Sequence, residues 1–177
     1  TSAAIVRERE RGNMELLITT PLAALELMIG KIFPYIFIGA IQVIIILGLG
    51  YFFFNAPING GLWQLTFATL LFISASLVLG LVISTLAKNQ LQSMQMTVFI
   101  LLPSILLSGF MFPYEGMPEI AQYIAEGLPA THFIRLVRGV VLRDVAVVDM
   151  TFDMVWLIGF TLLGLMVAAL RFKKSLD

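Results

Sequence analysis

Residues 6–31 read VRERERGNMELLITTPLAALELMIGK, and this stretch is a long polar interruption ahead of a series of very apolar segments. Residues 7–11 alternate arginine and glutamate, and Gly12-Asn13 then breaks the pattern. The short piece that follows has apolar residues at i, i+3 and i+4, which form one face of a helical turn: Met14, Leu17 and Ile18. An apolar face beside a charge cluster is typical of a segment that lies at a membrane surface and presents one face to a soluble partner.

A second helical run is predicted in the other half of the same stretch. Thr20-Pro21 is typical of a helix start, with a hydroxyl side chain at the N-cap and proline at the first helical position. The run covers residues 22–29, and we expect it to end at Gly30-Lys31. A simpler interpretation stays open, in which the whole stretch is a basic loop beside the membrane that only fixes the orientation of the chain.

The composition of the chain is that of an integral membrane protein. It has 177 residues, of which 59% are hydrophobic and 12% are charged. An ordinary soluble domain is about half apolar and about a quarter charged. The formal net charge is +0, so no overall positive field indicates binding to nucleic acid. Cysteine is absent, which excludes disulfides and thiolate chemistry within this chain.

Several segments are long enough and sufficiently free of charge to cross a bilayer, which takes about 20 apolar residues. The sequence therefore predicts an all-α, polytopic transmembrane helical bundle, because uncharged runs of this length without period-2 alternation argue against strands. Residues 1–6 resemble the tail of an earlier helix, and we expect the chain to lack its N-terminal part. The predicted full spans are residues 32–54, 62–87, 91–112 and 154–170.

Two of these spans carry small residues four apart, a pattern that lets another helix approach closely. We expect the small residues of the span over residues 62–87 to pack within the same subunit rather than to form a seam between two subunits, and those of the span over residues 154–170 form another close-packing stripe. They are Ser76, Gly80 and Ser84 in one span, and Gly164 and Ala168 in another.

The basic residues predict the orientation of the chain, since cytoplasmic loops of membrane proteins are enriched in lysine and arginine. If residues 7–31 lie in the cytosol and the spans alternate, every lysine and arginine falls on the cytosolic side except Arg135, Arg138 and Arg143. The segment that carries these three arginines, residues 113–150, is therefore predicted to lie on the outer side.

The strings RERERGNMELLITTPL and ELMIGKIFPY resemble the cytosolic loop of the ABC-type-2 exporter permeases, the membrane subunits of one class of ATP-driven transporter. The resemblance extends more loosely over essentially the whole chain and implies a single transmembrane permease domain over residues 1–177. In this family the loop, here residues 7–31, holds a coupling helix that docks on the ATPase subunit. The residues that the resemblance assigns to coupling are Arg11, Gly12, Asn13, Met14, Glu15, Leu17 and Ile18.

The same resemblance implies the partners of the chain. The family works as a pair of membrane subunits, a homodimer or a heterodimer, together with ATP-binding subunits and membrane lipid. ATP and Mg would be bound by the partner ATPase, because Gly30-Lys31 lacks the upstream glycine and the hydroxyl of a P-loop. The sequence has no zinc motif or nucleophile elbow, so we expect no enzymatic activity and no cofactor or metal bound by this chain.

The span over residues 91–112 differs from the others because its first part is polar and Pro103 interrupts it. One helical face of this span is a candidate lining for a translocation route, which would suit amphipathic small molecules or lipids. The alternative is a kinked helix that only packs against its neighbours. The residues of the candidate route are Gln95, Phe99, Leu102 and Leu106.

Residues 113–150 resemble the outer re-entrant segment that follows the fifth helix in this family. Residues 119–125 and 131–142 predict two short amphipathic helices, and Thr131 is the expected cap of the second. His132 is the one histidine of the chain, and without cysteine or a second histidine it makes a poor metal site. We expect His132 to have a structural or interfacial role.

These observations predict the permease subunit of an ATP-driven ABC exporter that crosses the inner (plasma) membrane several times. No acidic or basic residue lies in the middle of a span, which argues against an ion-coupled carrier. Two alternatives stay open. One is a membrane anchor or assembly factor that moves nothing, and the other is an intramembrane enzyme, against which the lack of a catalytic constellation argues.

Overall fold

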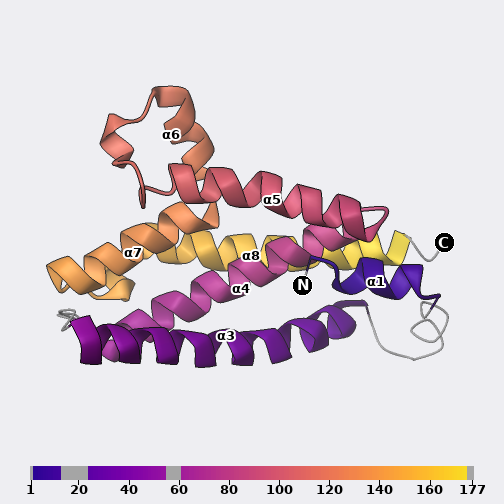
Figure 1. Cartoon of the computed structure of the whole chain (residues 1–177), viewed down its shortest axis with the longest axis horizontal. Coiled ribbons are helices and arrows are strands. Elements are labelled where there is room, and N and C mark those ends of the chain that lie inside the picture. The colour runs from indigo at the N-terminus through magenta and orange to yellow at the C-terminus, as the bar shows by residue number, and fades with distance from the viewer. Residues whose placement is uncertain (1, 13–23, 55–60, 175–177) are drawn as a thin grey trace.

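The computed structural model describes residues 2–12, 24–54 and 61–174, and this part of the chain is built from helices and loops without strands. Its long helices run along the long axis of the molecule (Figure 1). Because they are long and apolar enough to cross a membrane, the predicted all-α, polytopic bundle is confirmed. They are α3 (Ala24–Phe54), α4 (Leu62–Leu86), α5 (Gln90–Leu107) and α8 (Thr151–Lys174).

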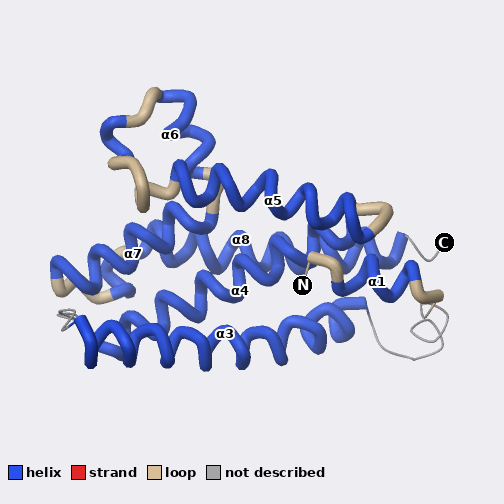
Figure 2. Tube along the Cα trace, in the orientation of Figure 1, coloured by secondary structure: helices blue, strands red, loops and turns tan. Residues whose placement is uncertain are grey.

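Shorter elements lie at the two ends of the long helices. The start of α3 and the end of α8 share one end with α1 (Ala4–Glu10), on the right in Figure 1. The other end carries α6 (Glu119–Glu126) and α7 (Pro129–Arg143), with the single turns η1 (Tyr114–Gly116) and η2 (Val147–Asp149). Figure 2 shows the described loops gathered near these ends, as expected where helices rather than loops must fill the membrane.

α4 is the central helix, because it contacts α1, α3, α5, α7 and α8. Its approach to α8 is close: a Cβ atom added at Gly164 would lie 2.3 Å from Val78 Cγ1. Ala168, one turn further along α8, is completely buried. The small residues of α8 therefore allow a close approach of another helix, as the sequence predicts, and that helix is α4 of the same subunit.

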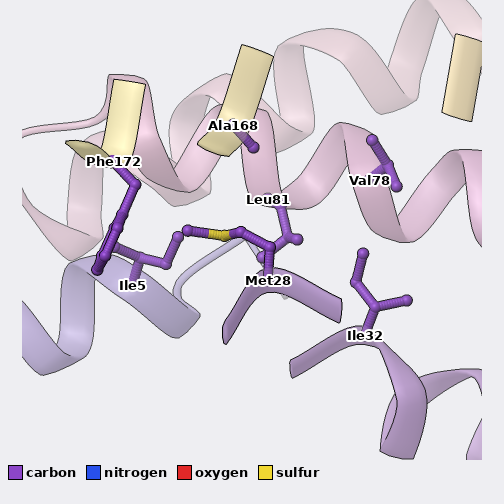
Figure 3. Close-up of a cluster of buried hydrophobic side chains, with 7 residues drawn as sticks. All are labelled: Ile5, Met28, Ile32, Val78, Leu81, Ala168 and Phe172. Carbon is purple, nitrogen blue, oxygen red and sulfur yellow. The ribbon is translucent and has the colours of Figure 1, made fainter. Parts of the chain in front are cut away.

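Two apolar cores hold the bundle together. One joins α1, α3, α4 and α8, and Figure 3 shows Ile5, Met28 and Phe172 pointing toward one another from three of these helices. The other joins α4, α7, η2 and α8 around buried Leu65, Leu136 and Leu157. Each core therefore lies between one end of α4 and the short elements packed beside it.

The expected helix end at Gly30-Lys31 is wrong, because α3 runs without a break from Ala24 to Phe54. Glu8 of α1 forms an ion pair with Lys31, and this pairing neutralises the charge of Lys31 within the helix. Pro34 lacks the N–H that would bond to the Gly30 carbonyl, yet the helix continues through it. Both flanks of the predicted coupling loop, residues 7–31, are thus helical.

The third span is shorter than predicted, because α5 ends at Leu107 and not at residue 112. Ser108 caps the helix, and Gly109 then takes a φ of 88°, in the left-handed region that turns the chain away from the helix axis. Pro103 lies inside α5 without ending it. At the other end the Asn89 side chain accepts a 2.7 Å hydrogen bond from the Gln92 N–H and caps the helix.

Two boundaries at the end that carries α6 and α7 also differ from prediction. α7 begins at Pro129, whose fixed φ suits the first helical position, so Thr131 lies inside the helix and is not its cap. α8 is longer than residues 154–170 at both ends, and Asp153 lies in its first turn. Asp153 is accommodated there because side chains of α7 bind it, as described below.

Candidate coupling and transport site

The start of the predicted coupling segment lies at a helix end. Arg11 follows α1 as its C-cap, with helical backbone angles and an exposed side chain. Gly12 has a φ of 71°, which favours glycine and directs the chain out of the axis of α1. The other predicted coupling residues lie outside the described residues: Asn13, Met14, Glu15, Leu17 and Ile18.

The two helices that flank this segment are joined by side chains. Glu8 of α1 forms an ion pair with Lys31 of α3, so the segment leaves and re-enters the bundle at neighbouring points. Glu10 Oε1 accepts a hydrogen bond of 2.9 Å from the backbone N–H of Gln90, in the first turn of α5. α1 is thus joined to both α3 and α5 through short polar contacts.

α1 is also joined to α4 through a buried hydroxyl. Ser84 Oγ accepts hydrogen bonds from the backbone N–H groups of Ile5 and Val6, at 3.0 and 3.2 Å. The sequence placed Ser84 among the small residues of a packing stripe, so its buried position was predictable but its partners were not. Neither Ser84 nor the two glutamates of α1 were assigned to the site from sequence.

The predicted route residues share one face of α5, and that face is exposed. Phe99 is 80% exposed, Leu102 is 55% exposed and Leu106 is 42% exposed, and Gln95 is exposed on the same side. These four side chains point away from the rest of this chain. They can therefore line a route only together with lipid or with a second membrane subunit.

A pocket that the sequence did not predict lies on the other side of α5, between α5 and α4. Its volume is about 210 Å³, and it is lined by Thr97, Leu101 and Ser104 together with Ser76 and Gly80 of α4. The threonine and serine hydroxyls of α5 donate to the carbonyl groups of Ser93 and Ile100 within their own helix. Their spacing at i and i+7 was the signal in the sequence.

Polar side chains join η1, α6 and α7 to one another. Arg135 of α7 binds the Glu126 carboxylate through both terminal nitrogens, one of them at 3.1 Å. The Tyr114 hydroxyl donates to the same carboxylate at 2.7 Å. Hydrogen bonds from Arg135 hold the pKa of Glu126 below its ordinary value, and the hydrogen bond to Glu126 raises the pKa of Tyr114.

His132 joins α7 to α8 and is completely buried. Its Nδ1 lies 2.7 Å from Asp153 Oδ1, and its Nε2 lies 3.0 Å from the Glu126 carbonyl oxygen. The ring stacks on Trp156 with centroids 4.0 Å apart. Across the described ranges no group of three or more potential metal ligands occurs. The contacts of His132 join α7 to α6 and α8.

Comparison with known proteins places this geometry in a family. Residues 1–142 match the family described as ABC-2 type transporter. The chain is 32% identical over 178 residues to an Escherichia coli protein named "Probable multidrug ABC transporter permease YbhS", covering 100% of this chain and 47% of that protein. It is 29% identical over 186 residues to the E. coli "Inner membrane transport permease YhhJ", covering 99% of this chain and 47% of that protein.

A more distant relative is "ABC transporter G family member 20" of Dictyostelium discoideum, 24% identical over 145 residues, with 82% of this chain and 20% of that protein covered. No solved structure matches the chain. The chain spans about half the length of the bacterial relatives that it matches. The family match covers residues 1–142, more than half of the sequence, and the chain belongs to the ABC-2 type transporter family.

Proposed function

We propose that this chain is the membrane permease part of an ATP-driven exporter that moves amphipathic small molecules or lipids out across the inner (plasma) membrane. The proposal is supported by the family match, by relatives whose names describe ABC transporter permeases, and by the apolar helices. ATP and Mg belong to a separate ABC ATPase subunit, and a second permease subunit completes the transporter.

The observation that carries the mechanism is the set of polar contacts around α1. Glu8 joins α1 to α3, Glu10 joins α1 to α5, and Ser84 joins α4 to α1. α1 and α3 are the helices that precede and follow residues 13–23. When the ATPase moves the coupling helix, these contacts pass the movement into the bundle as a rigid-body shift. The exposed face of α5 would change its access from one side of the membrane to the other.

The coupling helix should dock through its apolar residues, Met14, Leu17 and Ile18. Burial of such a small face is worth a few kcal/mol at about 25 cal/mol per Å². Exposed charge pairs such as those of Arg11 and Glu15 add about 1 kcal/mol or less each. Apolar contacts therefore dominate docking, and the charges adjust its register.

Leu17→Asp tests the coupling assignment. We expect this variant of the full-length protein to insert and fold but to lose co-purification with the ATPase, whereas Glu15→Ala loses it only in part. Co-purification and ATPase activity with and without transported compound are measured for both. A tight complex and normal stimulation with Leu17→Asp would show that residues 7–31 act only as an orientation signal.

The exposed face of α5 is the proposed substrate route. Phe99→Ala and Leu102→Ala should change which compounds are exported while the amount of folded protein stays nearly constant. Phe37→Ala is the matched control, because Phe37 is a 66% exposed phenylalanine on α3. Uniform loss of export for every compound, in step with loss of folded protein, would instead favour a helix that only packs.

A further inference from the structure

A cavity of about 360 Å³, lined by both polar and apolar residues, lies at the end of the molecule that carries α6 and α7 (Figure 1). It is bounded by the end of α5, by η1, by one face of α7 and by the first turn of α8. All three arginines that the charge distribution predicts to be on the outer side line this one cavity: Arg135, Arg138 and Arg143.

Two of these guanidinium groups have no carboxylate partner among the described residues. Arg138 donates a 2.6 Å hydrogen bond to the carbonyl oxygen of Gly109, which is a neutral acceptor. Arg143 is exposed and forms no ion pair within the described part of the chain. Arg135, in contrast, is neutralised by Glu126. The cavity thus holds positive charge that the fold itself leaves unpaired.

Thr131 also lines this cavity, and its buried hydroxyl has no partner among the described residues. Thr131 is 1% exposed, and within the described residues its Oγ1 has no hydrogen-bond partner. Buried polar atoms in folded proteins are almost always hydrogen-bonded, so a hydroxyl in this position indicates a group that it can bind. A hydroxyl can donate to an oxyanion, as the two guanidinium groups can.

The acidic residues of the cavity do not cancel this charge. Asp153 is bound by His132 at 2.7 Å and lies 3.6 Å from Arg135, so it is already paired. Glu115 is exposed and forms no ion pair in the described ranges. Two unpaired cations therefore face one unpaired carboxylate, which leaves an excess of one positive charge for an anionic ligand.

The surroundings of the cavity are apolar. Gly109 is followed by Phe110, Met111 and Phe112, which are 70%, 58% and 56% exposed. Guanidinium groups recognise phosphate and carboxylate groups through paired hydrogen bonds. We propose that this cavity binds the phosphate headgroup of an anionic, lipid-like amphiphile, with Arg138, Arg143 and Thr131 as its donors and Phe110–Phe112 against its apolar part. Binding of a ligand in this cavity does not require that the chain takes part in ATP-driven transport.

Binding of short-chain phosphatidic acid to the full-length protein in detergent tests the proposal. Diacylglycerol with the same chains serves as the uncharged probe, and inorganic phosphate serves as the soluble one. We expect saturable binding of phosphatidic acid, and binding of diacylglycerol weaker by about tenfold or more, because hydrogen bonds between charged groups are lost. Inorganic phosphate that binds as tightly as phosphatidic acid would assign the cavity to a soluble anion and overturn the amphiphile.

Substitutions of the lining residues test whether phosphatidic acid binds in this cavity. Arg143→Gln removes no hydrogen bond or ion pair found among the described residues, and Arg138→Gln combined with it should weaken the binding of phosphatidic acid by about tenfold or more. Thr131→Val should weaken binding without lowering stability, since its hydroxyl has no partner to lose. Arg171→Gln, at the far end of α8, is the matched control and should leave binding unchanged. Equal affinity in the control, in Arg143→Gln and in the double variant would overturn the proposal.

Discussion

The hydrogen-bond partners of His132 determine where protons are needed on its ring and on Asp153. The Glu126 carbonyl oxygen can only accept, so Nε2 carries a hydrogen. The 2.7 Å contact between Nδ1 and Asp153 then requires a second proton, either on the ring or on the carboxylate. The pair therefore holds one proton more than a neutral histidine beside an ionised aspartate, and this proton joins α7 to α8.

Asp153→Asn tests this contact. The amide keeps the shape of the carboxyl group but cannot carry the shared proton, so we expect a loss of about 1–3 kcal/mol in the free energy of unfolding, the range for a buried group that loses its hydrogen-bond partner. Titration with a denaturing detergent in mixed micelles measures it. Asp149→Asn is the control, because Asp149 is exposed. Equal stability of the two variants would mean that the buried pair contributes nothing to the fold.

The close packing of α4 against α8 depends on a small residue at position 164. Val78 is completely buried, and a β-branched side chain in a helix has little freedom to rotate away. A Cβ atom at Gly164 would lie 2.3 Å from it, so the two helices would have to separate. The small-residue spacing in the sequence predicts such a close approach, although it does not identify the partner helix.

Gly164→Ala should therefore destabilise the bundle by about 1–3 kcal/mol, the usual cost of overpacking. Gly159→Ala is the matched control on the same helix, because a Cβ atom there would meet nothing within 4 Å. We expect the control to leave stability unchanged or to raise it, since alanine favours a helix over glycine. Thermal unfolding of both variants in detergent is the measurement, and equal melting temperatures would contradict the close approach.

Sequence reasoning predicts the bounds of an element well where the residues of that element alone determine them. The span over residues 62–87 matches α4 within one residue, because long apolar content decides it locally. The predicted break at Gly30-Lys31 fails because Glu8, which neutralises Lys31, is distant in sequence. The end of α5 was missed because residues 110–112 are as apolar as a span, and the turn before them depends on the backbone of Gly109.

The candidate site also has some features that the local sequence predicts and others that depend on tertiary contacts. Helical spacing placed Gln95, Phe99, Leu102 and Leu106 on one face, but only the packing of α5 shows that this face is directed away from the chain. The pairing of His132 with Asp153 joins residues 21 apart on two helices, and no local pattern predicts it. Contacts that depend on tertiary placement were thus the ones that sequence reasoning missed.

At the scale of the whole molecule, polar contacts are concentrated at the two ends and apolar surface lies between them. One end carries α1 and its contacts to α3, α4 and α5, beside the proposed ATPase docking segment. The other end carries the Glu126, Arg135, His132 and Asp153 network. Between them, α3 and α5 expose side chains such as Phe33 and Phe99, which suits contact with lipid or with a second membrane subunit.

The central claim is that this chain forms the membrane path of an ATP-driven exporter, and transport in proteoliposomes tests it most directly. The full-length protein is reconstituted with its ATPase, and movement of a fluorescent amphiphile is followed with and without ATP. We expect ATP-dependent movement that disappears when the ATPase carries an inactivating Walker-motif substitution. Movement that is the same in all these conditions, although the complex is intact, would contradict the claim and favour a membrane anchor.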